Sequence, residues 1–347
     1  MKKYLPFLSI AITILGCVSC NNQDNEYNDN MTSCPIDSLH SEILNNSFIL
    51  AKPTAIFVCD STLIVTDSHC GDNLFYTFRA TDGSFLKGGG KKGEAPGEVL
   101  NPEKVHINNQ GILSYWDIYK RKFIHYDIHA FLKDSTQYFS ESTLEYKQAK
   151  NIQILDAIKT RNGSIYNGNS EQNIGIYPAN RYLDAPSLPG VSSKELCRAV
   201  MNRGHLEVSP DCKHAIRATP IGGIVQCFDI DNQTVREKWL KLFFPPIFKL
   251  AKGAKPAWIT WKPETQMGFE DLQATDQAAY LLLNGKFAKD EPYANEVLVI
   301  DWDGNVTKKY VLDQTVKSIA VNETQNVLYA ITCGFDVEPN IVRFSIS

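Results

Sequence analysis

The sequence predicts an all-β protein, because two features of its apolar pattern favour strands. Short segments rich in β-branched and aromatic residues recur between turns of Gly, Asn and Asp, as in AIFVCDSTLIVTD (55–67) and EVLVIDWDG (296–304). Helical periodicity is scarce, and its clearest example is SSKELCRAVMNRG (192–204), with Ser192 or Ser193 as the N-cap. We therefore expect strands joined by tight turns and one short inserted helix.

The chain begins with a predicted lipoprotein signal peptide over residues 1–19. The start MKK precedes YLPFLSIAITIL, an apolar run of about a dozen residues, which is too short to span a bilayer as a permanent helix. Small residues before a cysteine follow, and this arrangement resembles a lipobox. Cys20 is the predicted lipidation site and Cys17 is the alternative. We therefore expect the protein to be anchored by lipid to a membrane of the cell envelope.

Residues 20–39 are predicted to form a flexible tether, because they are rich in Asn and Asp and poor in large apolar residues. The remaining residues, 40–347, are long enough for a sizeable core in a chain that is 43% hydrophobic. The formal net charge of −4 argues against a nucleic-acid partner, which needs a basic face to displace counterions. The cysteines beyond Cys20 lack metal-ligand spacing, and their disulfide pairing cannot be deduced from the sequence.

The strands recur in units of about 40–50 residues, which is the length of a propeller blade. Six units can be placed, and they begin near Lys52, Pro102, Tyr146, His205, Thr265 and Thr315. The last unit supplies only three strands before the chain ends. We expect residues 41–49 to pair with the strand at 341–346, which would remove an exposed edge. The prediction is a six-bladed β-propeller with an amino-terminal strand closing the last blade.

Several motifs carry a resemblance to a known family. The segments GKKGEAPGEVLNPEKVHIN (90–108), EVSPDCKHAI (207–216) and VLVIDWDGNVTKKYVLD (297–313) resemble those of the TolB-like and NHL-like six-bladed propeller lipoproteins of Gram-negative bacteria. Val99 stands where that family often has Phe, and Cys212 stands where Gly usually follows Asp. Most members have no assigned activity, so the resemblance implies a fold and no catalytic residues.

The glycine-rich stretch FLKGGGKKGEAPGEVLNP (85–102) raises the question of nucleotide binding. Its glycines match G-x-G-x-x-G, but a dinucleotide loop opens a helix, and Pro96, Gly97 and Pro102 forbid one here. A P-loop also fails, because Glu94 occupies the required lysine position. We interpret the stretch as a connection between blades in which glycines adopt positive φ, and we expect no nucleotide ligand.

Lysines near these glycines give the stretch an alternative role. Anion capture by Lys91 and Lys92, with Lys87 nearby, is the minor hypothesis. Trp258 and Trp261 in KPAWITWKPE (255–264) could stack on a sugar ring, although burial against the propeller is the preferred interpretation.

The segment TDSHCGDN (66–73) contains residue types that bind metals. Asp67, His69, Cys70 and Asp72 could ligate an ion, but a polar turn needs the same residues, and we predict no metal here and no cofactor. The isolated histidines are interpreted as structural residues, namely His125, His205 and His214.

Two classes of function remain open. The favoured one is a non-enzymatic binding or scaffolding module that presents its loops to an envelope protein, peptide or glycan. The rival is an envelope hydrolase or lyase with acidic residues at the central channel. Three or more Asp, Glu or His side chains meeting in the channel would favour the enzyme, and a large apolar surface patch beside an empty channel would favour the binding module.

Overall fold

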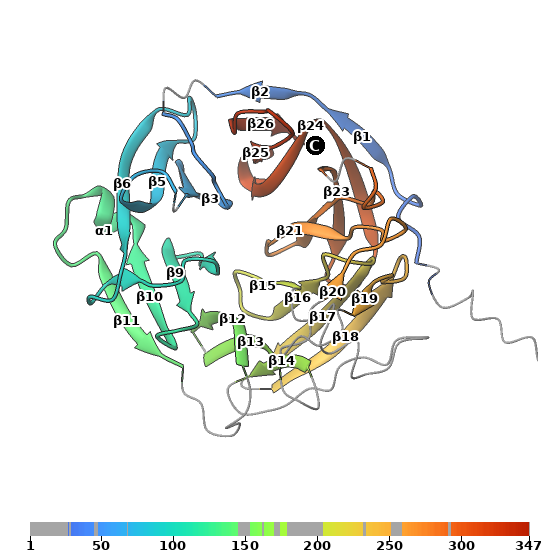
Figure 1. Cartoon of the computed structure of the whole chain (residues 1–347), viewed down its shortest axis with the longest axis horizontal. Coiled ribbons are helices and arrows are strands. Elements are labelled where there is room, and N and C mark those ends of the chain that lie inside the picture. Colours follow the sequence, from blue (N-terminus) through green and yellow to red (C-terminus); the bar gives the residue numbers. More distant parts are fainter. Residues whose placement is uncertain are drawn as a thin grey trace, which may run out of the picture.

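The computed structural model shows six β-sheet blades arranged as a ring around a central channel, with one eight-stranded sheet forming two of the blades (Figure 1). It describes residues 27, 29–44, 48–67, 69–144, 153–161, 163–169, 174–178, 204–231, 234–250, 259–290 and 293–346. The predicted signal peptide with Cys17 and Cys20, residues 192–203 of the predicted helix, and Trp258 lie outside these residues. No helix among the described residues has the length and apolar character that a membrane span requires.

Each of the first three blades is an antiparallel sheet whose first strand lies nearest the channel (Figure 1). Blade 1 contains β3 (Ala55–Cys59), β4 (Thr62–Thr66), β5 (Asn73–Arg79) and β6 (Phe85–Lys92), with β7 (Glu98–Val99) parallel to β6. Blade 2 contains β8 (Val105–Ile107), β9 (Ile112–Asp117), β10 (Lys122–Asp127) and β11 (Phe139–Thr143). Blade 3 contains β12 (Gln153–Thr160), β13 (Gly163–Asn169) and β14 (Ile174–Pro178).

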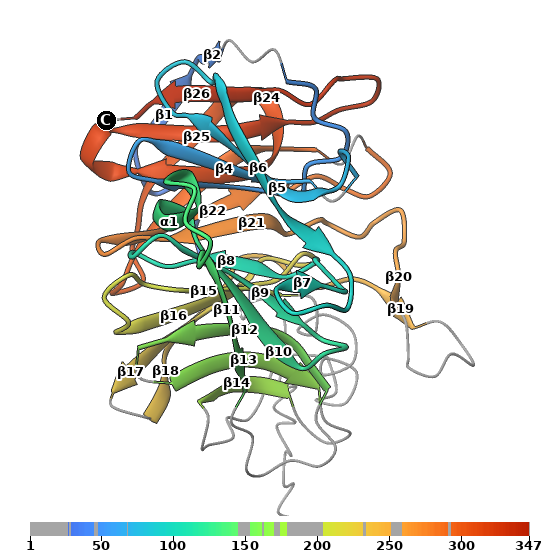
Figure 2. The same ribbon diagram turned by 90° about the vertical axis from the view of Figure 1, so that its left-hand side faces the viewer.

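The other three blades follow the same order from the channel outward. Blade 4 contains β15 (His205–Val208), β16 (His214–Ala218), β17 (Ile224–Asp231) and β18 (Thr234–Leu242). Blade 5 contains β21 (Phe269–Ala274), β22 (Ala278–Leu283), β23 (Ala294–Asp301) and the first half of β24 (Val306–Asn322). Blade 6 contains the second half of β24, then β25 (Val327–Thr332), β26 (Ile341–Ser345) and β2 (Ser41–Ile43). A hairpin of β19 (Lys249–Leu250) and β20 (Ile259–Thr260) projects from the ring (Figure 2).

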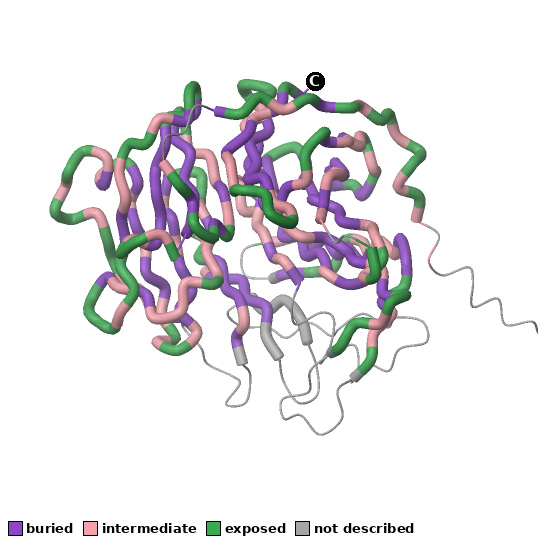
Figure 3. The backbone as a smooth tube through the Cα atoms, turned by 45° about the horizontal axis from the view of Figure 1, so that its top comes forward, coloured by how far each residue is buried: buried purple, intermediate pink, exposed green. Residues whose placement is uncertain are grey.

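The core lies between neighbouring blades. Middle strands are buried on both faces, and every residue of β4 and of β22 is buried (Figure 3). One cluster joins blades 4 and 5, where Val225 and Leu281 share a core, and another joins blades 1 and 6, where Leu63 and Ile331 do. Strands with apolar residues on both faces are therefore explained by a sheet that packs against a blade on each side.

The amino-terminal strand closes the ring as predicted, but the paired strand covers residues 41–43, which is shorter than the predicted 41–49. In β2, Ser41 pairs with Phe344 and Ile43 pairs with Val342 of β26. Between them, the guanidinium of Arg343 donates two hydrogen bonds of 2.8 and 2.9 Å to the carboxylate of Glu42. Pairing begins before the predicted domain boundary, because β1 (Ile36–Leu39) runs parallel to β24. The last residues of the predicted tether are therefore a strand on the edge of blade 5.

The described helix is one that the sequence pattern did not predict. It is α1 (Ile128–Leu132), inserted between β10 and β11. Asp127 is its N-cap, and the carboxylate accepts a hydrogen bond of 2.9 Å from the backbone N–H of Ala130. Ile128 and Phe131 bury its inner side against blades 1 and 2. Five residues are too few to produce a helical period, which is why the pattern missed it.

Candidate ligand-binding channel

The centre of the ring contains a cavity of about 810 Å³. Its wall is built from the first strands of all six blades, namely β3, β8, β12, β15, β21 and the second half of β24. Polar and charged residues line the cavity at many positions of these strands and of the residues next to them. Examples are Lys104, Lys159, His205, Glu270 and Lys317. A polar ligand is therefore the kind of molecule that this cavity suits.

A buried histidine joins three neighbouring blades at the wall of the cavity. His106 of β8 places Nε2 2.8 Å from Asp156 Oδ1 on β12 and Nδ1 2.9 Å from Glu207 Oε1 on β15. A shift of register in β12 between Ile154 and Asp156 marks a bulge, a feature that re-aims side chains. The first strands of blades 2, 3 and 4 are thus held together by one imidazole.

The two neighbouring carboxylates determine the protonation state of His106. Burial alone would lower its pKa, but the carboxylates of Asp156 and Glu207 raise the pKa of His106 to about 10. Burial opposes ionisation of Asp156 too, yet His106 and Lys104 together lower the pKa of that carboxyl. By contrast, burial and the nearby charge of Lys104 lower the pKa of His205 to about 3. At neutral pH His106 is therefore an imidazolium with both nitrogens engaged, and His205 is neutral.

A second buried carboxyl joins the other three blades. Asp271 of β21 accepts hydrogen bonds from Ser318 Oγ (2.6 Å) and from the backbone N–H of Ile319 (2.9 Å), both on β24. Ser318 Oγ in turn accepts the backbone N–H of Ile56 on β3 at 3.0 Å. Burial raises the pKa of Asp271 to about 7. Blades 5, 6 and 1 are therefore joined at the cavity wall by this carboxyl and one hydroxyl.

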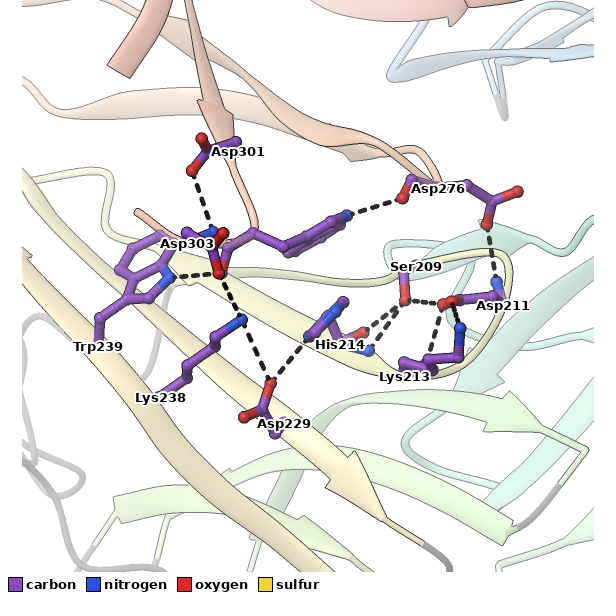
Figure 4. A network of polar contacts seen from close by, with 11 residues as sticks. Ser209, Asp211, Lys213, His214, Asp229, Lys238, Trp239, Asp276, Asp301 and Asp303 are labelled. Atoms are coloured by element: carbon purple, nitrogen blue, oxygen red, sulfur yellow. Dashed lines mark hydrogen bonds and ion pairs between the residues drawn. The ribbon is translucent and has the colours of Figure 1, made fainter. Parts of the chain in front are cut away.

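The β15–β16 turn contacts three other blades at the rim of the channel. The carbonyl of Pro210 accepts a hydrogen bond of 3.2 Å from Asn109 Nδ2 of blade 2, and the carbonyl of Asp211 accepts one of 2.7 Å from the guanidinium of Arg161, next to β12. The backbone N–H of Asp211 donates to Asp276 Oδ1 of blade 5 at 3.0 Å (Figure 4). Since Asn109, Pro210 and Asp276 all line the cavity, this turn helps to define its opening.

The same turn is anchored to a layer of aromatic and acidic residues between blades 4 and 5 (Figure 4). The imidazole of His214 stacks on the indole of Trp302, with ring centroids 4.8 Å apart and planes 17° apart. Trp302 Nε1 donates to the carbonyl of Asp276 at 3.2 Å, and Trp239 Nε1 donates to the carbonyl of Trp302 at 3.0 Å. His214 Nδ1 also lies 3.0 Å from Asp229 Oδ1. Its contacts give His214 a structural role, as predicted.

The predicted glycine stretch is a blade connection. It forms β6, the outer strand of blade 1, then β7, and leads to β8 of blade 2. Gly90 and Gly97 have φ of 69° and 76°, so positive φ occurs where it was expected. Lys91 and Lys92 pair with Glu98 and Val99 in this connection and are not part of the cavity wall. Their capture of an anion remains a prediction.

Asp67, in the segment that contains metal-binding residue types, binds backbone groups. The carboxylate of the fully buried Asp67 accepts backbone hydrogen bonds of 2.8 to 3.0 Å from Ala51, Lys52 and His69. Asp117 repeats this role in blade 2, where it accepts backbone N–H groups of Leu100, Asn101, Tyr119 and Lys120. Both aspartates stand at the end of the second strand of a blade, so the segment follows a repeated structural pattern.

Other predicted residues lie away from the cavity. Trp261 follows β20 and is 55% exposed, which differs from the burial that was preferred for it. His125 is a satisfied structural residue, because its ring nitrogens lie 2.8 Å from the hydroxyls of Ser114 and Ser142.

Sequence reasoning missed the charged residues that meet at the cavity wall. These are His106, Asp156, Glu207 and Asp271, each of which lies inside the first strand of a blade. The signal that could have identified them is the recurrence of ionisable residues in the first strands of successive blades, which face a common channel.

The ring and its polar channel define a six-bladed β-propeller. The family model for TolB-like 6-blade propeller-like proteins matches residues 32–324, and the chain belongs to this family. No curated protein matches the sequence.

Several solved structures are similar to this chain at low sequence identity. A candidate exported protein of Bacteroides fragilis has a TM-score of 0.47 and 11% identity over 89% of this chain and 98% of its own. A member of the DUF4221 family from Bacteroides vulgatus has a TM-score of 0.47 and 9% identity over 88% and 95%, respectively. A luciferin-regenerating enzyme has a TM-score of 0.44 and 11% identity over 89% and 95%.

Proposed function

We propose that the protein is a lipid-anchored, non-enzymatic binding propeller of the cell envelope that takes a polar ligand, part of a glycan or peptide, into its central channel. The observation that carries this proposal is the cavity of about 810 Å³ whose wall comes from all six blades. Its size is within the range of small-ligand sites, and its charged wall favours hydrogen-bonding groups over apolar ones. Nucleic acids and nucleotides are not expected ligands.

The state of the ionisable groups favours binding over catalysis. His106 has both ring nitrogens occupied by carboxylates, and its raised pKa keeps it protonated at neutral pH, so it has no lone pair with which to act as a base. Asp271 accepts two hydrogen bonds from blade 6. These groups hold the blades in register and keep the wall of the cavity fixed, which is the preorganisation that ligand binding needs.

Thermal shift and calorimetric titration with panels of envelope glycans and short peptides test the binding function. Lys159 and Lys317 line the cavity, so a true channel ligand should bind at least about tenfold more weakly to Lys159→Ala and Lys317→Ala, a loss of roughly 1.4 kcal/mol. Lys133→Ala, in the α1 C-cap of blade 2, is the control. Equal affinity for a ligand in all four proteins would argue against the channel as its site.

Lipid anchoring is tested separately. Cys20→Ser should lose fatty-acid label and appear in the soluble fraction, whereas Cys17→Ser should keep both the label and the membrane association. The reverse result would transfer the anchor to Cys17.

One specific observation favours the alternative hypothesis of a hydrolase or lyase. His106, Asp156 and Glu207 meet at the cavity wall as that hypothesis requires, and Asp271 has a carboxyl whose pKa of about 7 suits proton transfer. Incubation of the same glycans and peptides, followed by mass spectrometry, separates the two functions. Turnover that is lost in Asp271→Asn while binding persists would favour the enzyme.

A further inference from the structure

Three side chains with different metal-binding atoms converge at the edge of blades 1 and 2. They are Cys59, Asp60 and His129, and their Sγ, carboxylate oxygen and ring nitrogen lie within 4.8 Å of one another. Cys59 ends β3, Asp60 follows it in the β3–β4 turn, and His129 is in α1. Among the residues that the structure describes, these three are the group of His, Cys, Asp or Glu side chains that could hold a metal ion.

Local backbone geometry fixes the place of each residue. Asp60 adopts φ of 51° at a two-residue hairpin turn, a conformation that Asp tolerates well. The N-cap hydrogen bond from Ala130 to Asp127 positions the short helix that carries His129. The three potential ligands therefore come from ordered turns of two blades.

Distances between the ligand atoms suit a small tetrahedral ion. His129 Nε2 lies 3.7 Å from Cys59 Sγ and 3.8 Å from Asp60 Oδ2. Zinc ligands about 2.0–2.3 Å from the ion at tetrahedral angles are roughly 3.3–3.7 Å apart, so the two contacts of His129 Nε2 require shifts of only tenths of an ångström. The distance between Cys59 Sγ and the Asp60 carboxylate oxygen is within 4.8 Å. The side chains of His129 and Asp60 are 47% and 79% exposed, which leaves them room for such shifts.

A glycine opposite the cluster keeps the space open. Gly111 in the β8–β9 turn has φ of 75°, and a Cβ placed there would lie 2.7 Å from His129 Nε2 and 2.9 Å from Cys59 Sγ. Any larger residue would therefore displace two of the three ligand atoms. The backbone carbonyl of Gly111 also accepts the N–H of Ile128, which ties this turn to the start of α1.

The local charge favours a cation. Two carboxylates, those of Asp60 and Asp127, place negative charge near the Cys59 sulfur. A divalent ion would offset these carboxylates. Its binding would break the S–H bond, release the proton to solvent and form a metal–thiolate bond.

From this convergence of sulfur, imidazole and carboxylate ligands we propose a zinc-type transition-metal site at Cys59, Asp60 and His129. Thiolate and imidazole select zinc over calcium and magnesium, whose sites are built from oxygen ligands. Three protein ligands leave a fourth position for water or a ligand atom. Because Asp60 also lines the central cavity, the ion would lie at the edge of the cavity, although the proposal does not depend on the channel's function.

Cobalt(II) binding tests the site directly, because a cobalt–thiolate bond has a near-ultraviolet charge-transfer absorption. The full chain carrying Cys17→Ser and Cys20→Ser is the reference protein, since these changes remove the two leader thiols. We expect one equivalent of Co²⁺, displaced by Zn²⁺, with the thiolate band. Cys59→Ser should lose this band, and Asp60→Asn and His129→Gln should each weaken binding at least about tenfold.

Matched controls come from residues 66–73 of blade 1, which also contain a cysteine and a histidine. Cys70→Ser and His69→Gln replace the same residue types and should bind Co²⁺ as the reference does. Melting temperatures check that each variant is folded, and Asn at position 60 tolerates the positive φ. The proposal is overturned if the reference binds no stoichiometric Co²⁺ or Zn²⁺, if the thiolate band survives in Cys59→Ser, or if it is lost in Cys70→Ser.

Discussion

His106 Nε2 lies 2.8 Å from Asp156 Oδ1, a contact that joins the first strands of two blades across fifty residues of sequence. The other ring nitrogen contacts Glu207 of the next blade. Since the imidazole is buried, the ion cluster contributes to the stability of the ring only while His106 carries its proton.

The pKa of His106 predicts a loss of stability in alkali. A pKa raised from 6.5 to about 10 on folding gives stabilisation that is complete below pH 6.5 and lost as the pH rises towards 10. The melting temperature should therefore fall over this range. His106→Gln should melt lower at neutral pH, since removing one partner of a buried ion cluster costs about 3–5 kcal/mol, and should lack this His-dependent fall.

The exposed His40, between β1 and β2, provides the control for this experiment, because it lies outside the buried cluster and the proposed metal site. His40→Gln should retain the wild-type dependence of melting temperature on pH. Parallel profiles for wild type and His106→Gln would show that His106 does not titrate with folding.

The blade connection predicts different effects for its glycines and its lysines. At Gly97, with φ of 76°, a Cβ would lie 2.5 Å from the ring of Phe139. Gly97→Val should therefore lower the free energy of unfolding by about 1–3 kcal/mol or more. Lys91→Ala with Lys92→Ala should leave the melting temperature unchanged and alter no nucleotide affinity. Micromolar ATP or NAD binding that the double variant loses would contradict this interpretation.

Ring closure predicts that the amino-terminal strands stabilise the last blade. A chain that begins at Lys52 lacks β1, β2 and the ion pair between Glu42 and Arg343, so β26 becomes an open edge. Its melting temperature should be lower and its tendency to aggregate higher. Glu42→Gln serves as a milder variant, with an expected change below about 1 kcal/mol because the pair is exposed. Undiminished stability of the shortened chain would contradict a role for β2 in closure.

The β15–β16 turn predicts a stabilising substitution. Cys212 adopts φ of 60°, a left-handed conformation that glycine adopts more readily than cysteine. Cys212→Gly should raise the melting temperature, because relief of the left-handed conformation gains about 1 kcal/mol and exceeds the entropic cost of glycine. Cys70→Gly is the comparison, since Cys70 is not among the residues with positive φ, and it should not be stabilised.

The repeat pattern of the sequence predicted the six blades and their closure, because both follow from local information. Strand periodicity places each blade, and a final unit with three strands requires a fourth from elsewhere. The glycine connection was also predictable, since Pro96 and Pro102 exclude a helix on covalent grounds. The blades and the glycine connection depend on residues that are close in sequence. Closure required only one long-range inference, the pairing of the amino-terminal strand with the last blade.

The charged cluster could not be predicted because it depends on how blades rotate relative to one another. His106 and Glu207 are 101 residues apart, and neither has a sequence neighbour that reveals the other. Similarly, Asp67 has the residue type of a metal ligand, but its partners are the backbone groups of Ala51 and Lys52, which sequence spacing does not identify. The hydrogen bonds of Asp67 to backbone N–H groups distant in sequence therefore decide between a metal ligand and a structural residue.

One continuous strand links the two blades that carry the closure. β24 is the outer strand of blade 5 and then, without interruption, the innermost strand of blade 6, and β1 and β2 extend this sheet along its edge. Breaking open either blade disrupts hydrogen bonds of the same strand, so amide hydrogens across both should exchange with solvent as one cooperative unit. Blades 5 and 6 therefore share one unbroken strand of backbone. We expect the ring to separate more readily between blades that are bridged by side chains such as His106.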